Sequence, residues 1–268
     1  MAKRRGKALS KYPRDSYFLA TKFPIWAAET EADLERIFNE QLQRTQAGYF
    51  DFYLLHALNA ERVDKIQKLK VYEFFAQKKA EGKIRHLGFS FHDTPAVLER
   101  ICSLYEWDFA QIQLNYLDWE MQDAKGQYEV LTKHGIPVIV MEPVRGGALA
   151  HPCDESVRIF EEAAPGKSAA SWAIRFAESL PNVQVVLSGM STMDQIRDNV
   201  ATMSDFHPLT DEERAVIEKA LDAYKAHKTI PCTGCRYCMD CPFGVNIPLV
   251  FQVYNRYRHD GSKDRFKK

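Results

Sequence analysis

The sequence predicts an α/β fold with a parallel sheet, and two patterns carry this prediction. Six short apolar runs each end in a polar residue, and amphipathic segments with a helical period lie between them. A run of about six apolar residues is too short for a helix and too continuous for a half-exposed strand, so it indicates a strand buried on both faces. Alternation of such strands with helices is typical of parallel sheets with crossover connections.

The clearest of the six expected strands is Phe50 to His56, an apolar run that closes on a histidine. Polar residues likewise end the other runs. In a β/α barrel the carboxyl ends of the strands form the mouth, where catalytic and ligand-binding groups collect. The other expected strands are Tyr17 to Lys22, His86 to Ser90, Phe109 to Asn115, Val138 to Glu142 and Val183 to Ser188.

The segment from Thr30 to Ala47 is the best expected covering helix, because Leu34, Ile37, Phe38 and Leu42 share one stripe and a Thr-x-x-Asp pattern caps its start. Another capping box, Thr-Asp-Glu-Glu, opens a later helix from residue 210 to about 224. The remaining expected helices are Val63 to Glu81, Thr94 to Tyr105, Met121 to His134, Ser168 to Leu180 and Met193 to Met203.

Composition favours one principal domain and a protein without a polyanionic partner. The 268 residues are 46% hydrophobic, and a barrel commonly needs about 250 residues. Lys+Arg and Asp+Glu both number 36, so no overall charge favours nucleic acid or a membrane. The basic stretch Met1 to Arg14 is interpreted as a solvated helix rather than a targeting or nucleic-acid arm. No segment approaches the roughly 18 apolar residues of a membrane span, and a cytoplasmic location is expected.

Lys22 and His56 close two strands that are neighbours along the chain. Each also has a non-catalytic explanation, because a lysine at a strand end often extends to the surface and a lone histidine is more often structural than catalytic. Together, at the mouth-side ends of adjacent barrel strands, they could polarise a carbonyl and tune a nearby acid.

Three segments together resemble the aldo/keto reductase superfamily: Ala20 to Lys22, Phe52 to His56 and Gly82 to Ser90. The chain is most similar to the branch with a C-terminal ferredoxin-type domain. The resemblance implies an eight-stranded TIM-type β/α barrel over residues 1–228 and NAD(P)H-dependent reduction of a small carbonyl substrate. It also implies that Lys22 tunes a proton donor and that His56 orients the substrate carbonyl.

The tyrosine and aspartate of that family have no counterpart here, since the strand that carries them would precede the lysine strand. Tyr17 lies an odd number of residues from Lys22 and faces the other way on a regular strand, and Tyr12 precedes Pro13 in an expected turn. The expected barrel therefore lacks its first two strands, as in a fragment of a longer gene product, and has two open edges. Impaired reduction is expected, and a catalytically silent cofactor-binding or electron-transfer protein is the alternative.

The resemblance also assigns a cofactor site. Ser90 and Gln111 match positions that bind the nicotinamide carboxamide, although Phe91 replaces the asparagine that usually follows the serine. Met141 matches an aromatic residue that stacks on nicotinamide. NADP-preferring members often carry cations at two positions that are Gly189 and Gln195 here, so both NAD and NADP are considered as cofactors. The pyrophosphate and adenosine positions are Ser188, Gly189, Met190, Gln195, Asp198 and Asn199, in a strand-to-helix turn whose amides suit a phosphate.

Four of the six cysteines, Cys232, Cys235, Cys238 and Cys241, lie within ten residues and precede a proline. Zinc ribbons separate their cysteine pairs by about 15 to 20 residues, so an iron–sulfur site is favoured over zinc. Residues 229–268 are expected to form a partial ferredoxin-type segment that binds one 4Fe-4S cluster and meets a redox partner. Clustered rather than evenly spread cysteines also favour a reducing compartment.

Overall fold

The computed structural model describes residues 2–227, 229–230, 232 and 238–261. The chain forms two compact units, of which the first combines Met1–Ile112 with Lys125–Ile139 and the second combines Gln113–Ala124 with Val140–Lys268. This division does not coincide with the expected boundary between residues 228 and 229, which stays a prediction. No helix in the described ranges has the length and apolar character needed to cross a membrane.

The strands form one six-stranded sheet in the order β1-β2-β3-β4-β5-β6, so each strand lies beside its neighbours in the chain. The paired registers are parallel. The expected alternation of strands and helices is therefore confirmed, and within the described part of the chain β1 and β6 are the end strands. The strands are β1 (Ala20–Phe23), β2 (Phe50–Leu58), β3 (Ile84–Phe91), β4 (Phe109–Gln113), β5 (Val138–Met141) and β6 (Val183–Val186).

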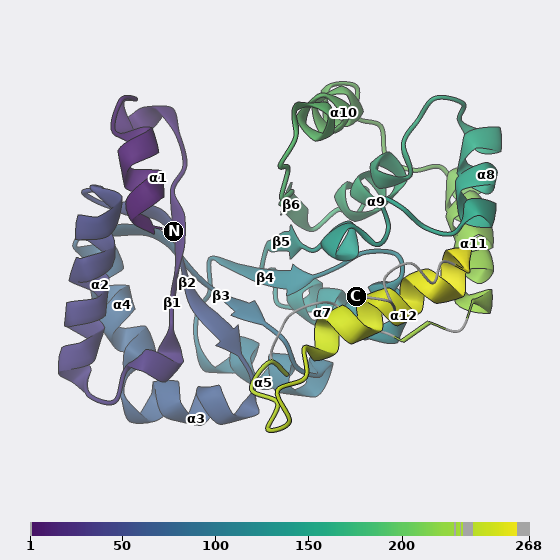
Figure 1. Cartoon of the computed structure of the whole chain (residues 1–268). Coiled ribbons are helices and arrows are strands. Elements are labelled where there is room, and N and C mark those ends of the chain that lie inside the picture. Colours follow the sequence, from purple (N-terminus) through teal and green to yellow (C-terminus); the bar gives the residue numbers. More distant parts are fainter. Residues whose placement is uncertain (1, 228, 231, 233–237, 262–268) are drawn as a thin grey trace. The chain divides into compact units, whose positions relative to one another are not determined.

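Helices connect and follow the strands (Figure 1). Those of the first unit are α1 (Ala2–Leu9), α2 (Glu31–Thr45), α3 (Ala60–Lys68), α4 (Val71–Ala80), α5 (Pro95–Leu104) and most of α7 (Ala124–Lys133). Those of the second unit are α6 (Asp118–Met121), α8 (Asp154–Ala163), α9 (Ala169–Glu178), α10 (Met193–Ser204), α11 (Asp211–Ala226) and α12 (Ile247–Asp260).

Helix α2 covers the first strands, as its apolar stripe predicts. Its buried Phe38 packs edge-on against Phe50 and Tyr53 of β2, with ring centroids 5.9 and 5.3 Å apart. The capping box of Thr30 and Asp33 is present at its start. Tyr53 donates its hydroxyl hydrogen to Gln41 Oε1 on the same helix, 2.7 Å away, so this tyrosine lies under α2 and away from the strand ends.

The expected helix over residues 63–81 is wrong, because the chain breaks it into α3 and α4 at Lys70, whose φ is 49°. In a continuous helix Lys70 would follow Ile66 by four residues and fall on the buried face. The break places Val71 and Phe75 there instead, and both are fully buried. Helix α7 also starts later than expected, after Asp123 with φ of 50°.

The N-terminal stretch forms a helix with exposed residues such as Lys7, as expected, but one side of this helix is packed rather than solvated. Helix α1 lies against α2 (Figure 1), and a Cβ on Gly6 would come within 2.8 Å of the carbonyl oxygens of Arg44 and Thr45. Glycine is thus the residue that permits this close approach. The basic residues after α1 also have partners, as Arg14 shows.

Asp51 is a buried acid inside the apolar run of β2, with 1% of its side chain exposed. It accepts hydrogen bonds from Arg14 at 2.6 Å, Arg85 at 2.8 Å and the Leu19 amide at 2.8 Å. Burial by itself would raise the pKa of Asp51, but the Leu19 amide and the two guanidinium groups lower it below the ordinary value of 3.8.

Because the folded-state pKa of Asp51 is depressed, its stabilisation is present above about pH 4 and is lost as pH falls through the folded pKa. We expect Asp51→Asn to lose about 2 kcal/mol of unfolding free energy at pH 7, with solvent screening the half-exposed Arg85. We expect a smaller loss at pH 3. Urea unfolding at both pH values tests this. Asp15→Asn, at an exposed position next to Arg14, is the control. Equal losses of unfolding free energy for Asp51→Asn at the two pH values would contradict the prediction.

Candidate active site

In the first unit, Lys22 and His56 lie at the carboxyl ends of adjacent strands. Lys22 pairs with Leu54 in the parallel register, and His56 follows Leu54 by two residues, on the same side of β2. Lys22 is half-buried, and its ammonium forms no ion pair with the described residues. Burial lowers the pKa of Lys22 to about 8. The structure thus brings together the two residues predicted to act on a carbonyl.

His56 is surrounded by cations. Burial is the main cause that lowers the pKa of His56 to about 4, and the charges of Lys22, Arg62 and His92 lower it further. The indole ring of Trp26 lies 5.0 Å from the imidazole. His56 is therefore neutral at pH 7 and can donate one hydrogen bond while accepting another.

A distortion at the end of β2 shapes this cluster. The strand continues past His56 to Leu58, contrary to the expected end at the histidine, and Ala57 has a φ of 54° where the register shifts. The Ala57 amide donates to Ser90 Oγ at 2.8 Å, and the Arg62 guanidinium donates to the Ala57 carbonyl oxygen. Both polar groups of this unusual residue are therefore satisfied, which holds His56 in place.

Ser90 and Gln111 were both predicted to bind a nicotinamide carboxamide, and they pair directly in the β3–β4 register. Ser90 is fully buried, and its oxygen already accepts the Ala57 amide. Its hydroxyl hydrogen remains available as a donor. Gln111 is 5% exposed, so the pair is an internal polar patch in the sheet of the first unit.

A buried polar network occupies the second unit, centred on Asp118, which the sequence interpretation missed. Asp118 is fully buried and accepts hydrogen bonds from Gln113 and Asn115 at 2.7 Å each and from Gln122 at 3.1 Å. Gln113 and Asn115 are buried amides, which need hydrogen-bond partners. Asp118, five and three residues further along the chain, is that partner.

Asp118 also faces Arg145, whose Nε lies 3.1 Å from Asp118 Oδ1. The angles at this contact do not make it a hydrogen bond, and Arg145 Nη2 has no hydrogen-bond partner in the described residues. Arg145 belongs to the loop after β5, where Glu142 and Arg145 have φ values of 57° and 50°. Asn115 donates to the Glu142 carbonyl oxygen at 3.0 Å. The Asp118 carboxylate thus contacts this loop at Arg145 directly and at Glu142 through Asn115. The loop, with its two positive φ values, follows Met141 directly.

The turn from β6 into α10 carries the residues predicted for a pyrophosphate and adenosine. Gln195 Oε1 accepts hydrogen bonds from the Ser191 amide at 2.7 Å and the Thr192 amide at 3.2 Å, which closes a capping box. Asn199 donates to Ser188 Oγ at 2.8 Å, and Asp198 accepts from Ser168 Oγ at 2.6 Å. Gly189 and Met190 are exposed. Ser188, Gly189 and Met190 therefore lie in the exposed turn, whereas Gln195, Asp198 and Asn199 lie in the first two turns of α10.

The cysteine-rich segment lies partly outside the described residues, because Cys235 is not among them. Cys238 and Cys241 are free cysteines, and Cys232 is half-buried. The described ranges contain no group of three or more His, Cys, Asp or Glu residues arranged to hold a metal ion. Because Cys235 lies outside the described residues, the expected four-cysteine site stays a prediction.

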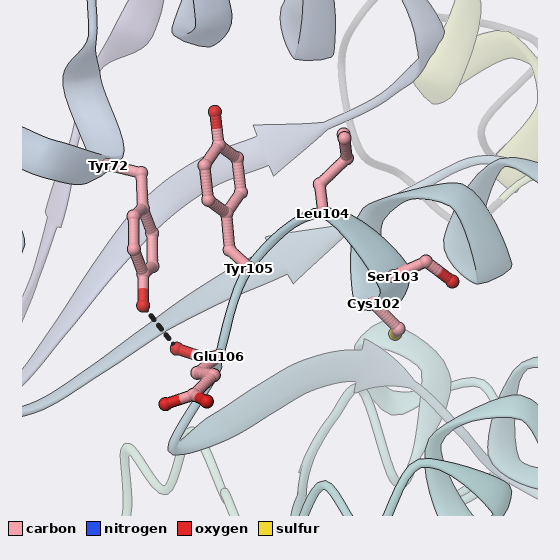
Figure 2. Close-up of a pocket in the computed structure, with 6 residues that line it drawn as sticks. All are labelled: Tyr72, Cys102, Ser103, Leu104, Tyr105 and Glu106. Carbon is pink, nitrogen blue, oxygen red and sulfur yellow. Dashed lines mark hydrogen bonds between the residues drawn. The ribbon is translucent and has the colours of Figure 1, made fainter.

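A separate hollow of about 470 Å³ lies in the first unit between α4 and the loop after α5 (Figure 2). Tyr72 and Tyr105 stack there with ring centroids 4.2 Å apart, and Tyr72 donates to the Glu106 carbonyl oxygen at 2.5 Å. Burial, and then Glu99, raises the pKa of Cys102 to about 12, so this thiol is no nucleophile at neutral pH. The hollow contains none of the predicted site residues.

Comparison with known proteins identifies relatives across most of the chain. The model of the aldo/keto reductase family matches residues 3–222. The uncharacterized oxidoreductase YqkF of Bacillus subtilis is 25% identical over 223 residues, covering 75% of this chain and 70% of that protein. The L-galactose dehydrogenase of Arabidopsis thaliana is 24% identical over 236 residues, with 80% and 72% covered.

A solved structure of an aldo-keto reductase from Bacillus halodurans, in its holo form, superposes with a TM-score of 0.67. It is 28% identical, and the match covers 82% of this chain and 76% of that chain. Together with the six parallel strands, this likeness fits a TIM-type barrel.

Proposed function

Because the chain belongs to the aldo/keto reductase family, we propose that it is an NAD(P)H-dependent oxidoreductase that acts on small carbonyl compounds. The observation that supports this proposal most directly is the placement of Lys22 and a neutral His56 near the ends of adjacent strands. The imidazole donates a hydrogen bond to the carbonyl oxygen, and the lysine ammonium stabilises the negative charge that develops there.

Reduction adds a hydride to the carbonyl carbon and a proton to the oxygen, so a proton donor is required. Tyr53, the tyrosine of β2, donates its hydroxyl hydrogen to Gln41 under α2 and is therefore no proton donor beside Lys22 and His56. With its pKa lowered to about 8, the Lys22 ammonium is the remaining acid. Loss of a well-placed general acid removes a contribution of about 10²- to 10⁴-fold, so we infer slow turnover.

In the first unit, Ser90 and Gln111 would bind the nicotinamide carboxamide, and the bound nicotinamide would supply the hydride. The role of Met141, in the second unit, stays a prediction. Ser188, Gly189 and Met190 would bind the pyrophosphate through hydroxyl and amide donors of an exposed turn at a helix start. Gln195, Asp198 and Asn199 would face the adenosine. Neither Gly189 nor Gln195 carries a positive charge, which favours NAD over NADP.

The 4Fe-4S cluster and its redox partner stay predictions, and no step of the proposed reaction uses them. Cys235, one of the four expected ligands, lies outside the described residues. A catalytically silent cofactor-binding protein remains the alternative to slow reduction, and turnover separates the two.

Steady-state reduction of small aldehydes with NADH and NADPH tests the proposal. We expect measurable turnover about 10²- to 10⁴-fold below that of an ordinary carbonyl reductase. It should fall above about pH 8, where Lys22 loses its proton. His56→Ala and Lys22→Met should abolish it while NADH binding, measured by fluorescence, persists. His134→Asn, near Glu99, is the matched control. Full activity in His56→Ala would contradict the assigned roles.

A further inference from the structure

The hollow between α4 and the loop after α5 is lined by aromatic side chains that packing holds in place. Tyr72 and Tyr105 stack with an angle of only 17° between their rings. The buried indole of Trp107 packs edge-on against both rings, with centroids 5.0 and 5.8 Å away. In Figure 2 the two tyrosine hydroxyl groups point in opposite directions, and that of Tyr72 is fixed by the Glu106 carbonyl oxygen. The hollow beside these rings, of about 470 Å³, has room for a small organic molecule.

Two carboxylates beside these rings have no ion-pair partner within the described residues. Glu106 lines the hollow, and Glu73 follows Tyr72 in α4; both side chains are exposed. Burial raises the pKa of Tyr72, and the charges of Asp108 and Glu106 raise it further. Burial also raises the pKa of Tyr105, and the charge of Glu73 adds to this. The carboxylates are therefore close enough for their negative charge to act on both phenol groups.

Two basic residues on the flanking helices are engaged with other acids. Lys79 of α4 contacts both carboxylate oxygens of Asp108 at 2.6 Å. Arg100 of α5 pairs with Asp64 at 2.7 Å. Each of these pairs compensates its own charge, so the uncompensated charge at the hollow is that of the two exposed glutamates.

Stacked aromatic rings beside uncompensated carboxylates are suited to a positively charged organic group. The face of a tyrosine ring carries negative partial charge and attracts a cation that lies within about 6 Å of the ring centroid. The carboxylates add Coulomb attraction to the same charge. Leu104, which also lines the hollow, offers apolar surface to alkyl groups on the cation. An anion would be repelled by both carboxylates, and a neutral molecule would gain only from burial of its apolar surface.

We propose that the hollow at Tyr72 and Tyr105 binds a small organic cation with an alkylated ammonium group. The ammonium lies against the tyrosine rings, with Glu73 and Glu106 as its counter-ions. No residue of the candidate active site lines the hollow, so this binding does not depend on the proposed oxidoreductase function.

The first experiment compares choline with 3,3-dimethylbutan-1-ol, which has the same shape but carries carbon in place of the charged nitrogen. Each is titrated into the full chain and followed by NMR. We expect choline to bind about tenfold more tightly, and its affinity to fall at high ionic strength. The methyl protons of choline should show nuclear Overhauser effects to the ring protons of labelled Tyr72 and Tyr105. Equal binding of the two compounds, or contacts of choline only with other tyrosines, would overturn the proposal.

The second experiment separates the contribution of the ring from that of the carboxylates. Tyr105→Leu should abolish the preference for choline, whereas Tyr105→Phe keeps the ring and should keep most of the affinity. The double variant Glu73→Gln/Glu106→Gln should weaken choline binding about fivefold and leave the neutral alcohol unaffected.

Glu31→Gln is the matched control, since it removes an exposed acid of the same unit on α2 and should leave choline binding unchanged. If Tyr105→Leu does not fold, the double glutamine variant decides, because both of its positions are exposed. Unchanged choline affinity in that double variant would overturn the proposed site.

Discussion

Replacement of Asp118 by alanine is expected to lower the free energy of unfolding by about 4 kcal/mol, because removal of one partner of a buried ion pair leaves the other charge uncompensated. Arg145 would stay buried with no carboxylate beside it. The amides of Gln113 and Asn115 would also lose their acceptor. Urea unfolding at pH 7, monitored by circular dichroism, measures the loss.

Glu120→Ala is the matched control for Asp118, since this neighbouring acid of α6 is exposed and pairs with Lys225 at the surface. Surface pairs of this kind contribute roughly 0 to 1 kcal/mol. In a double-mutant cycle, Asp118→Ala combined with Arg145→Met should be less destabilised than the sum of the single variants. A loss below about 1 kcal/mol for Asp118→Ala, or strict additivity, would show that the pair is not an energetic unit.

Gly88→Ala is expected to destabilise the first unit by about 3 kcal/mol or more, through steric overlap in the sheet. A Cβ at Gly88 would lie 2.4 Å from the Phe109 carbonyl oxygen and 2.7 Å from two carbons of its ring. The oxygen belongs to the backbone of β4 and cannot turn away, so the strands must separate. Phe109 also packs with Leu54 and Ile139 in a buried cluster, which would be displaced with it. Thermal unfolding and soluble yield measure the effect.

Gly48→Ala provides the comparison for Gly88, because a Cβ at residue 48 meets no atom within 4 Å and its backbone is not in the left-handed region. It is expected to change the unfolding free energy by less than about 1 kcal/mol. The losses from Gly88→Ala and Phe109→Ala should be less than additive in the double variant, because the ring contact is removed while the carbonyl contact remains. A Gly88→Ala protein as stable as the parent would contradict the steric account.

The sequence was sufficient to predict the strands because a parallel sheet requires continuous apolar runs, and each of the six runs became a strand. The break at Lys70 was missed because residues 63–81 contain no glycine or proline to mark it. It follows from burial of Val71 and Phe75, which depends on the sheet beneath them. Asp51 was missed for a similar reason, since its partners Arg14 and Arg85 are more than thirty residues away.

In the candidate site, Lys22 and His56 were predictable because each closes an apolar run near the carboxyl end of its strand, and these strand ends meet at one edge of a parallel sheet. Trp26 and Arg62 lie outside strands, and nothing local marks them as neighbours of His56. His92, two residues beyond Ser90, could have been recognised from the sequence as a further polar residue at the same edge of the sheet. Asp118 could also have been anticipated, as the acceptor that the amides of Gln113 and Asn115 require.

The strand order described above also has a consequence for how the chain acquires its structure. Paired strands are close in sequence, as Ala20 with Phe52, Leu54 with Gly88 and Gly88 with Phe109 illustrate. Closing loops of similar length carries a similar entropic cost at each step, since doubling a loop adds only about 0.6 kcal/mol. During synthesis on the ribosome, each new strand therefore finds its neighbour already exposed. Assembly can proceed from the N-terminus as the chain emerges, without waiting for distant segments.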